Sequence, residues 1–477
     1  MTGSSWTRAL KEARRPLAFF AGSIVAVGIA LFGGGFDALA PLSQQAVCAL
    51  GILAGCIIWW VSGVFPESVT ALIMAVAFIV ICGVPTEVAF SSFASSTWWL
   101  LVAAFALGLG MQRSGLMERM ASAILRIFPN TFKMQAAGLM AAGTLVGPFI
   151  PSLSAKATML APLSLGISDS LGYERKGRQA EGLFLAMFTG LRTIGPAVIS
   201  ASVIGYGLVA TLPSEVAARF DMLTWFVDML PWFAFVTIVD YIAIVALYGP
   251  RGKEAPAAAS AARTSERDPM TPVEKRLAAI MVCCILMWVT EPVHGVEAHV
   301  VAIMAMVLMV ATGVVSMKEL RSGVAWESLI FIGCVLGLAS VFAHLGIDAW
   351  IVSSCQPAFV ALAGDPYLLI TGICIITVLL RFVIVSEMAY INIFMAFMVP
   401  LSAGLGVSPW VIGVSVYAVV NPWFALYQNP IYLTAYYATE GEMVRQSSMA
   451  RYCVVYLAIC IVGLLISIPY WQWLGLL

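Results

Sequence analysis

The stretch that decides the fold is residues 147–162, which read GPFIPSLSAKATMLAP. It is apolar, three prolines interrupt it, and it contains a lysine, Lys156. A second interrupted apolar stretch, residues 381–400, reads RFVIVSEMAYINIFMAFMVP and carries Arg381 and Glu387. Interrupted hydrophobic segments at matching places in two halves of a chain point to the binding site of a secondary transporter. Charged residues inside such segments are costly, so they are functional candidates.

The composition places the chain in a lipid bilayer. Of its 477 residues, 61% are hydrophobic and 10% are charged, whereas a soluble protein has about 25% charged residues. The net charge is zero, which argues against nucleic-acid binding. The ten cysteines are scattered, without zinc or redox spacing. We therefore expect neither a metal site nor a cofactor, and whether the protein binds sodium stays open. No cluster of residues supports a membrane enzyme.

The hydrophobic segments predict an all-α polytopic membrane protein. A span needs about 20 apolar residues, and about 11 transmembrane helices are expected on this basis. We place them at residues 17–35, 42–64, 67–84, 98–112, 180–211 (broken at 195–196), 226–249, 276–291, 298–315, 326–343, 409–438 (broken near 429–430) and 450–474. Two further segments, 134–168 and 367–403, are too long for one span and are predicted to be re-entrant hairpins. Residues 116–128 and 347–363 are predicted to be interfacial helices that lead into them.

The distribution of basic residues predicts the orientation. If the N-terminus is cytoplasmic, nearly all of the 25 Lys and Arg residues fall in cytoplasmic segments. The exceptions are Arg219, on the other side, and three residues at membrane depth, Lys156, Arg192 and Arg381. This bias follows the positive-inside rule. It predicts a multi-pass inner-membrane protein whose first hairpin opens from the cytoplasm and whose second opens from outside. The basic N-terminus lacks a convincing cleavage site, so we expect a retained first helix.

The chain divides into two similar halves. Residues 1–40 form an N-terminal segment and first helix, 41–249 a first repeat, 250–275 a flexible cytoplasmic linker and 276–477 a second repeat. Short motifs recur between the repeats: Trp60-Val61 matches Trp288-Val289, and Pro162 after the first hairpin matches Pro400. An odd number of crossings between equivalent elements makes the repeat inverted, as in many secondary transporters.

The order of these elements and their motifs resembles the divalent anion–sodium symporter family of the ion transporter superfamily. The resemblance extends from about residue 42 to the C-terminus. In that family each hairpin tip carries Ser-Asn-Thr. Those positions fall here on Ser152-Leu153-Ser154 and, for the longer second motif, on residues 386–392. The family's broken-helix motifs fall on residues 193–196 and 427–430.

The resemblance implies a scaffold domain and a transport domain, an elevator-like movement and a homodimer. It also implies that substrate carboxylates and sodium ions bind at the hairpin tips. The candidate substrate-binding residues are therefore Ser152, Leu153, Ser154, Lys156, Arg192, Thr193, Ser386, Tyr390, Asn392 and Asn429. This chain departs from the family at the two motif asparagines, which are replaced by Leu153 and Ile391.

Lys156 leads to a hypothesis about coupling. Helix N-termini at a hairpin tip can bind an anion, but an ammonium beside the tip repels sodium. We expect the fixed charge of Lys156 to replace sodium, which favours exchange, uniport or proton coupling. The alternative roles for this lysine are snorkelling to the interface, which its position makes difficult, or a structural ion pair.

The other charges at membrane depth have two interpretations each. Arg192 faces either the substrate or an acidic partner such as Asp240. Asp240 is a proton-coupling group or an ion-pair partner of Lys156 or Arg192, because a carboxylate at this depth must be paired or neutral. Glu387 holds the second hairpin together or carries a coupling proton. Arg381 is expected to pair with Glu387.

The sequence thus predicts a secondary active transporter of small organic or inorganic anions, resembling di- or tricarboxylates. The alternative is a sodium-coupled dicarboxylate or sulfate symporter. A substrate-gated sensor or channel would need a soluble output domain, and we expect none at either terminus. The expected partners are an anionic substrate, the lipid bilayer and a second copy of the chain.

Overall fold

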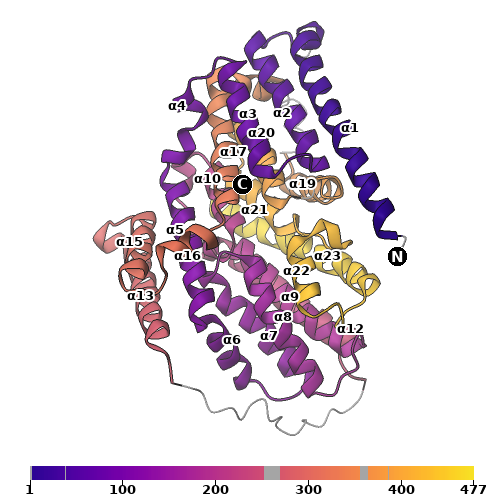
Figure 1. Ribbon diagram of the computed structural model, residues 1–477, viewed down its shortest axis with the longest axis vertical. Helices are drawn as coiled ribbons and strands as arrows, with labels where there is room; N and C mark the ends of the chain where they lie inside the picture. Colours follow the sequence, from indigo (N-terminus) through magenta and orange to yellow (C-terminus); the bar gives the residue numbers. More distant parts are fainter. Residues whose placement is uncertain (1–2, 38, 252–268, 355–363, 385) are drawn as a thin grey trace.

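The computed structural model describes residues 3–37, 39–251, 269–354, 364–384 and 386–477. Within these ranges the regular structure is helical, as predicted, and the helices form an elongated bundle (Figure 1). The elements before the linker are α1 (Gly3–Phe32), η1 (Gly33–Gly35), α2 (Gln44–Ser62), α3 (Glu67–Val80), α4 (Thr86–Ala89), η2 (Ser91–Ala94), α5 (Ser96–Ser114), α6 (Leu116–Ile127), α7 (Phe132–Val146), η3 (Gly147–Phe149), α8 (Leu153–Ser170), α9 (Arg178–Ala197), η4 (Ile199–Ala201), α10 (Val203–Thr211), α11 (Ser214–Ala217) and α12 (Met222–Tyr248).

The second half follows a similar succession of helices. Its elements are α13 (Pro272–Val289), α14 (Glu291–His294), α15 (Ala298–Ala311), α16 (Met317–Gly323), α17 (Trp326–Leu345), α19 (Pro366–Leu380), α20 (Glu387–Leu405), α21 (Pro409–Val419), η6 (Leu426–Gln428), α22 (Pro430–Ala438) and α23 (Gln446–Trp473). Helix–break–helix units at α7–α8 and α19–α20 match the two predicted hairpins. That the hairpins are re-entrant and that the two halves form an inverted repeat stay predictions.

Local sequence explains where the two hairpins break. In the first, Pro148 and Pro151 cannot continue α7, and the side chain of Ser152 accepts a hydrogen bond from the backbone N–H of Ala155 to begin α8. In the second, Ser386 begins α20 in the same way by accepting from the N–H of Ala389. In each hairpin, a capping serine therefore begins the helix that follows the break.

Helix α9 forms the centre of the core. Every residue from Ala180 to Ala197 is buried, and α9 contacts α7, α8 and α12, which lie beside it in Figure 1. Two glycines allow a very close approach to α7. A Cβ added at Gly190 would lie 2.8 Å from the Cα of Met140, and one at Gly143 would lie 2.9 Å from the backbone N of Leu191. Small residues at such contacts are typical of packed membrane helices.

The membrane-facing surface is apolar. Helix α1 lies along α2 at the edge of the molecule (Figure 1), and its outer side chains, such as Leu17 and Leu31, are at least 70% exposed. Five of the described helices are long and apolar enough to cross a membrane: α1 from Pro16, α2, α12, α17 and α23. Five other apolar helices in the described ranges have only 10–17 residues in the apolar stretch. The predicted number of about 11 spans therefore stays a prediction.

Several predicted boundaries need correction. The break placed at residues 195–196 lies further on, because α9 continues through Pro196 and the chain becomes extended only at Val198 and Ser202. The predicted second break near residues 429–430 is longer and runs from Val420 to Asn429. The predicted helix 116–128 is α6 (Leu116–Ile127), which is bent by 69° from α5. The predicted helix 347–363 is helical through residue 354, and the rest lies outside the described residues.

Candidate functional site

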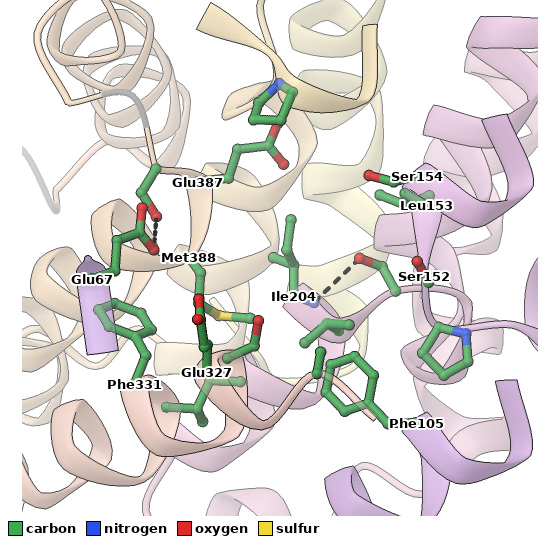
Figure 2. Close-up of a pocket in the computed structure, with 18 of the residues that line it drawn as sticks. Glu67, Phe105, Ser152, Leu153, Ser154, Ile204, Glu327, Phe331, Glu387 and Met388 are labelled. Atoms are coloured by element: carbon green, nitrogen blue, oxygen red, sulfur yellow. Dashed lines mark hydrogen bonds between the residues drawn. The ribbon is translucent and has the colours of Figure 1, made fainter. Parts of the chain in front are cut away.

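A cavity of about 500 Å³ lies between the tips of the two hairpins. Figure 2 shows Ser152, Leu153 and Ser154 on one side and Glu387 and Met388 on the other. Phe105 and Phe331 contribute apolar surface to the walls. The structure thus brings together the two interrupted segments, which are more than 200 residues apart in the sequence.

Six helices begin at the walls of this cavity. The lining residues include the first residues of α8, α20, α10 and α22, namely Leu153, Glu387, Val203 and Pro430, together with the beginnings of α3 and α17. The first turn of a helix leaves backbone N–H groups without intrahelical partners, and it carries the positive end of the helix dipole. Side-chain caps satisfy only some of these groups. The convergence therefore favours an anionic ligand.

The charged side chains that line the cavity are acidic, so their charge is opposite to that of the helix N-termini. Glu67, Glu327 and Glu387 are all lining residues, and among the described residues the lining contains neither lysine nor arginine. Glu67 accepts a hydrogen bond from the hydroxyl of Ser386 over 3.2 Å, which links α3 to the tip of the second hairpin. The positive charge for an anion must therefore come from the helix dipoles and from cations behind the wall.

Lys156 is one of these buried cations, and it does not line the cavity. Its side chain has no solvent exposure, and its Nζ donates to the carbonyl oxygens of Gly147, over 3.2 Å, and Ala201, over 2.6 Å. These carbonyls belong to the first hairpin tip and to the break after α9. The ammonium thus occupies the position of a cation between two unwound backbone segments. The predicted ion pair with Asp240 is wrong.

Arg381 occupies a comparable place in the second half. Its guanidinium donates to the carbonyl oxygens of Val420, over 2.7 Å, Gln428, over 2.9 Å, and Ile384. It therefore joins the second hairpin tip to the second broken segment, as Lys156 joins the first pair. The predicted pair between Arg381 and Glu387 is wrong, because the three carbonyls take up the guanidinium.

Glu387 pairs instead with Arg192. The Nη2 of Arg192 lies 3.5 Å from both carboxylate oxygens of Glu387. The two side chains are buried, and 195 residues separate them in the sequence. Asp240, the other expected partner of Arg192, accepts a hydrogen bond of 2.7 Å from the hydroxyl of Tyr452. The predicted Arg192–Asp240 pair is therefore also wrong.

Four other predicted site residues do not line the cavity. Thr193 forms hydrogen bonds of 2.9 Å with the carbonyl of Thr189 and the hydroxyl of Tyr456. Asn429 caps α22, since its Oδ1 accepts from the first backbone N–H groups of that helix. The other two, Tyr390 and Asn392, lie buried on α20: the hydroxyl of Tyr390 donates to Thr377, whereas the amide atoms of Asn392 have no hydrogen-bond partner among the described residues.

The sequence reasoning missed Glu67, Ser202 and Glu327 as lining residues. Glu67 and Glu327 each lie in the first turn of a long apolar helix, a place where a charge is usually taken to mark the membrane boundary. An acidic residue that directly begins an apolar span, as Glu67 does after Pro66, was the available signal. Ser202 was hidden because the break after α9 was placed too early.

A family model described as the sodium:sulfate symporter transmembrane region matches residues 24–477. The chain belongs to this family. The resemblance noted from the order of the elements and their motifs is thereby confirmed, and the protein is a multi-pass membrane transporter. The dicarboxylate transporters among its relatives are transport proteins rather than enzymes.

Individual relatives are distant. The chain is 24% identical to dicarboxylate transporter 1, chloroplastic, of Arabidopsis thaliana over 385 residues, which cover 77% of this chain and 68% of the relative. It is 25% identical to the inner membrane protein YbhI of Escherichia coli K12 over 385 residues, 77% of this chain and 80% of that protein. The crystal structure of the Alcanivorax borkumensis YdaH transporter, described as having an unusual topology, has a TM-score of 0.57 at 15% identity over 81% of this chain and 87% of that one. That likeness shows the fold.

Proposed function

We propose that this protein is a secondary active transporter of small di- or tricarboxylates, with the anion bound between the two hairpin tips. The observation that carries the proposal is the convergence of six helix N-termini on one cavity. A cavity of about 500 Å³ lies within the usual range of small-molecule sites. Ser152, Ser154 and Ser386 supply hydroxyl groups for orientation at the tips.

The relatives and the family support this substrate class. The Arabidopsis relative is named a dicarboxylate transporter, and the family is described by sodium:sulfate symport. Carboxylate and sulfate share the oxyanion chemistry that backbone N–H groups and hydroxyls bind. A small dicarboxylate is the first choice, and sulfate is the second.

We further propose that the transport cycle does not require sodium. At a sodium site in an unwound helix, backbone carbonyl oxygens coordinate the ion. Here the ammonium of Lys156 takes two such carbonyls and the guanidinium of Arg381 takes three. These tethered cations cannot leave, so transport would proceed by exchange or be coupled to protons. Asp240 and Glu387 are then the candidate proton carriers.

The second candidate function is a sodium-coupled dicarboxylate or sulfate symporter. The acidic lining of the cavity favours it, because the carboxylates of Glu67 and Glu327 would attract a cation. The two candidates differ in one requirement, which is external sodium.

The proposed assembly and movement of the protein are those that the family resemblance implies. We propose an inner-membrane homodimer with a cytoplasmic N-terminus, in which the two hairpins and the broken helices move together as an elevator. The basic residues on the predicted cytoplasmic side support this orientation.

The proposed function is tested with purified protein in liposomes that contain unlabelled succinate. Uptake of labelled succinate should exceed that of protein-free liposomes, and external succinate, malate or sulfate should compete with it. Neutral sugars should not compete. If no dicarboxylate and no sulfate is transported, in sodium or in choline, the proposal is wrong.

A further inference from the structure

Arg192 is a buried cation whose hydrogen-bonding capacity is largely unused. A guanidinium has five N–H donors. Only Nη2 reaches an acceptor, Glu387, and it does so at 3.5 Å. Its Nε and Nη1 have no hydrogen-bond partner among the described residues, although the side chain is only 1% exposed. A buried donor without an acceptor is costly, so this guanidinium has the capacity to bind a further acceptor.

Other ion pairs of the same chain show what a structural pair looks like. Arg445 lies 2.9 Å from Glu181, and Arg119 lies 2.9 Å from Glu274, in each case with a second nitrogen bonded to the second carboxylate oxygen. The Arg192–Glu387 pair is longer by 0.6 Å and leaves most of the guanidinium unbonded. It therefore lacks the close two-point geometry of a structural arginine–carboxylate pair.

The position of the pair connects this guanidinium to the cavity. Glu387 is the first residue of α20 and lines the cavity (Figure 2), and Arg192 lies behind it near the end of α9. The unbonded Nε and Nη1 of Arg192 thus lie on the far side of one cavity carboxylate.

We propose that the Arg192 guanidinium is the binding site for one carboxylate of the transported anion, and that Glu387 occupies this site when the anion is absent. The carboxylate of Glu387 is then an internal competitor of the same chemistry as the substrate. The inference rests on the proposed function and adds a binding subsite to it. It also explains why the second hairpin tip carries a carboxylate, Glu387. Sulfate, with its comparable oxygens, would bind in the same way.

Glu387 keeps a favourable environment when the anion displaces it. It also interacts electrostatically with Arg381, the second buried cation behind this tip. The displaced carboxylate therefore moves between two cations, and only the one at Arg192 has free donors.

The test compares single and double variants of the pair. Succinate and sulfate are titrated against purified Arg192→Gln, Arg192→Lys, Glu387→Gln and the double Arg192→Gln/Glu387→Gln protein, with melting temperature and transport KM as readouts. We expect Arg192→Gln to weaken succinate binding about tenfold or more, because a charged two-point contact is lost. Glu387→Gln should bind at least as tightly as the parent, because the internal competitor is gone. The double variant should stay weak, and Arg445→Lys serves as the control.

Two results would overturn the inference. The first is unchanged succinate affinity in both Arg192 variants. The second is a matched loss in Arg192→Gln and Glu387→Gln that the double variant restores, which is the pattern of a purely structural pair. If Arg192→Gln does not fold, the inference is tested by the other two single variants. Succinate should then bind more weakly to Arg192→Lys and at least as tightly as the parent to Glu387→Gln. A parent protein that binds neither anion would instead contradict the proposed function, and the subsite would fall with it.

Discussion

At the scale of single residues, Lys156, Arg192 and Arg381 lie buried in the described part of the chain, and their surroundings differ. Lys156 and Arg381 are satisfied by backbone carbonyls, whereas Arg192 is not. Burial of an ionised group is tolerated only when such partners are present. A carbonyl that lies in a helix break has lost its helical donor, so each tethered cation also satisfies backbone groups that the break leaves free.

Replacing Lys156 by methionine keeps the volume and removes the charge. The carbonyls of Gly147 and Ala201 then lose a donor, and we expect a loss of about 1–3 kcal/mol in stability. Because the freed carbonyls form a potential cation site, sodium chloride should raise the melting temperature of Lys156→Met relative to choline chloride. The parent should melt at the same temperature in both salts. Lys133→Met, at an exposed position, is the matched control. If sodium chloride also raises the melting temperature of that variant, the effect does not come from the carbonyls around Lys156.

Asp240 tests the coupling proposal at the same scale. Its carboxylate accepts from Tyr452, and the amide oxygen of an asparagine can accept the same hydrogen bond. Asp240→Asn should therefore fold. If Asp240 carries the coupling proton, succinate uptake by this variant should no longer increase when the external pH is lowered. An unchanged pH profile would exclude Asp240 as the proton carrier.

At the scale of elements, the sequence located both hairpin breaks, but it misplaced the break after α9. Prolines and serines locate both hairpin tips, because proline ends one helix and serine begins the next. The break after α9 was misplaced because Pro196 was taken as its cause. A proline in the last turn is tolerated, and the chain leaves the helix only afterwards. The convergence of six N-termini was not predicted, since it depends on packing between distant segments.

The packing of α7 on α9 depends on glycine. We expect Gly190→Ala to destabilise the protein by about 1–3 kcal/mol, because the new methyl group would overlap the backbone of Met140. The same substitution at Gly166, an exposed helical position with nothing within 4 Å, should leave stability unchanged or raise it by about 0.5–1 kcal/mol. Thermal unfolding of both variants in detergent measures the difference. Equal melting temperatures would contradict the close approach.

At the scale of the whole molecule, the sequence identified the charged residues but not their partners. Arg381 was paired with Glu387 because they are close in the chain, whereas the structure pairs Glu387 with Arg192, 195 residues away. Electrostatic partners at this distance follow from how the hairpins meet, which periodicity does not reveal. Glu67 and Glu327 were missed because each lies in the first turn of an apolar helix, where a charge is usually taken to mark the membrane boundary. The helical membrane-protein class, the family and the positions of the two hairpin breaks were predictable, because hydropathy and proline spacing are local properties.

The central claim is that tethered cations take the place of sodium in the transport cycle. It is tested most directly by the initial rate of labelled succinate uptake into succinate-loaded liposomes that contain the parent protein, measured in sodium and in choline at equal ionic strength. The account predicts equal rates in the two salts. Uptake that requires sodium, with a steep dependence on its concentration, would contradict it.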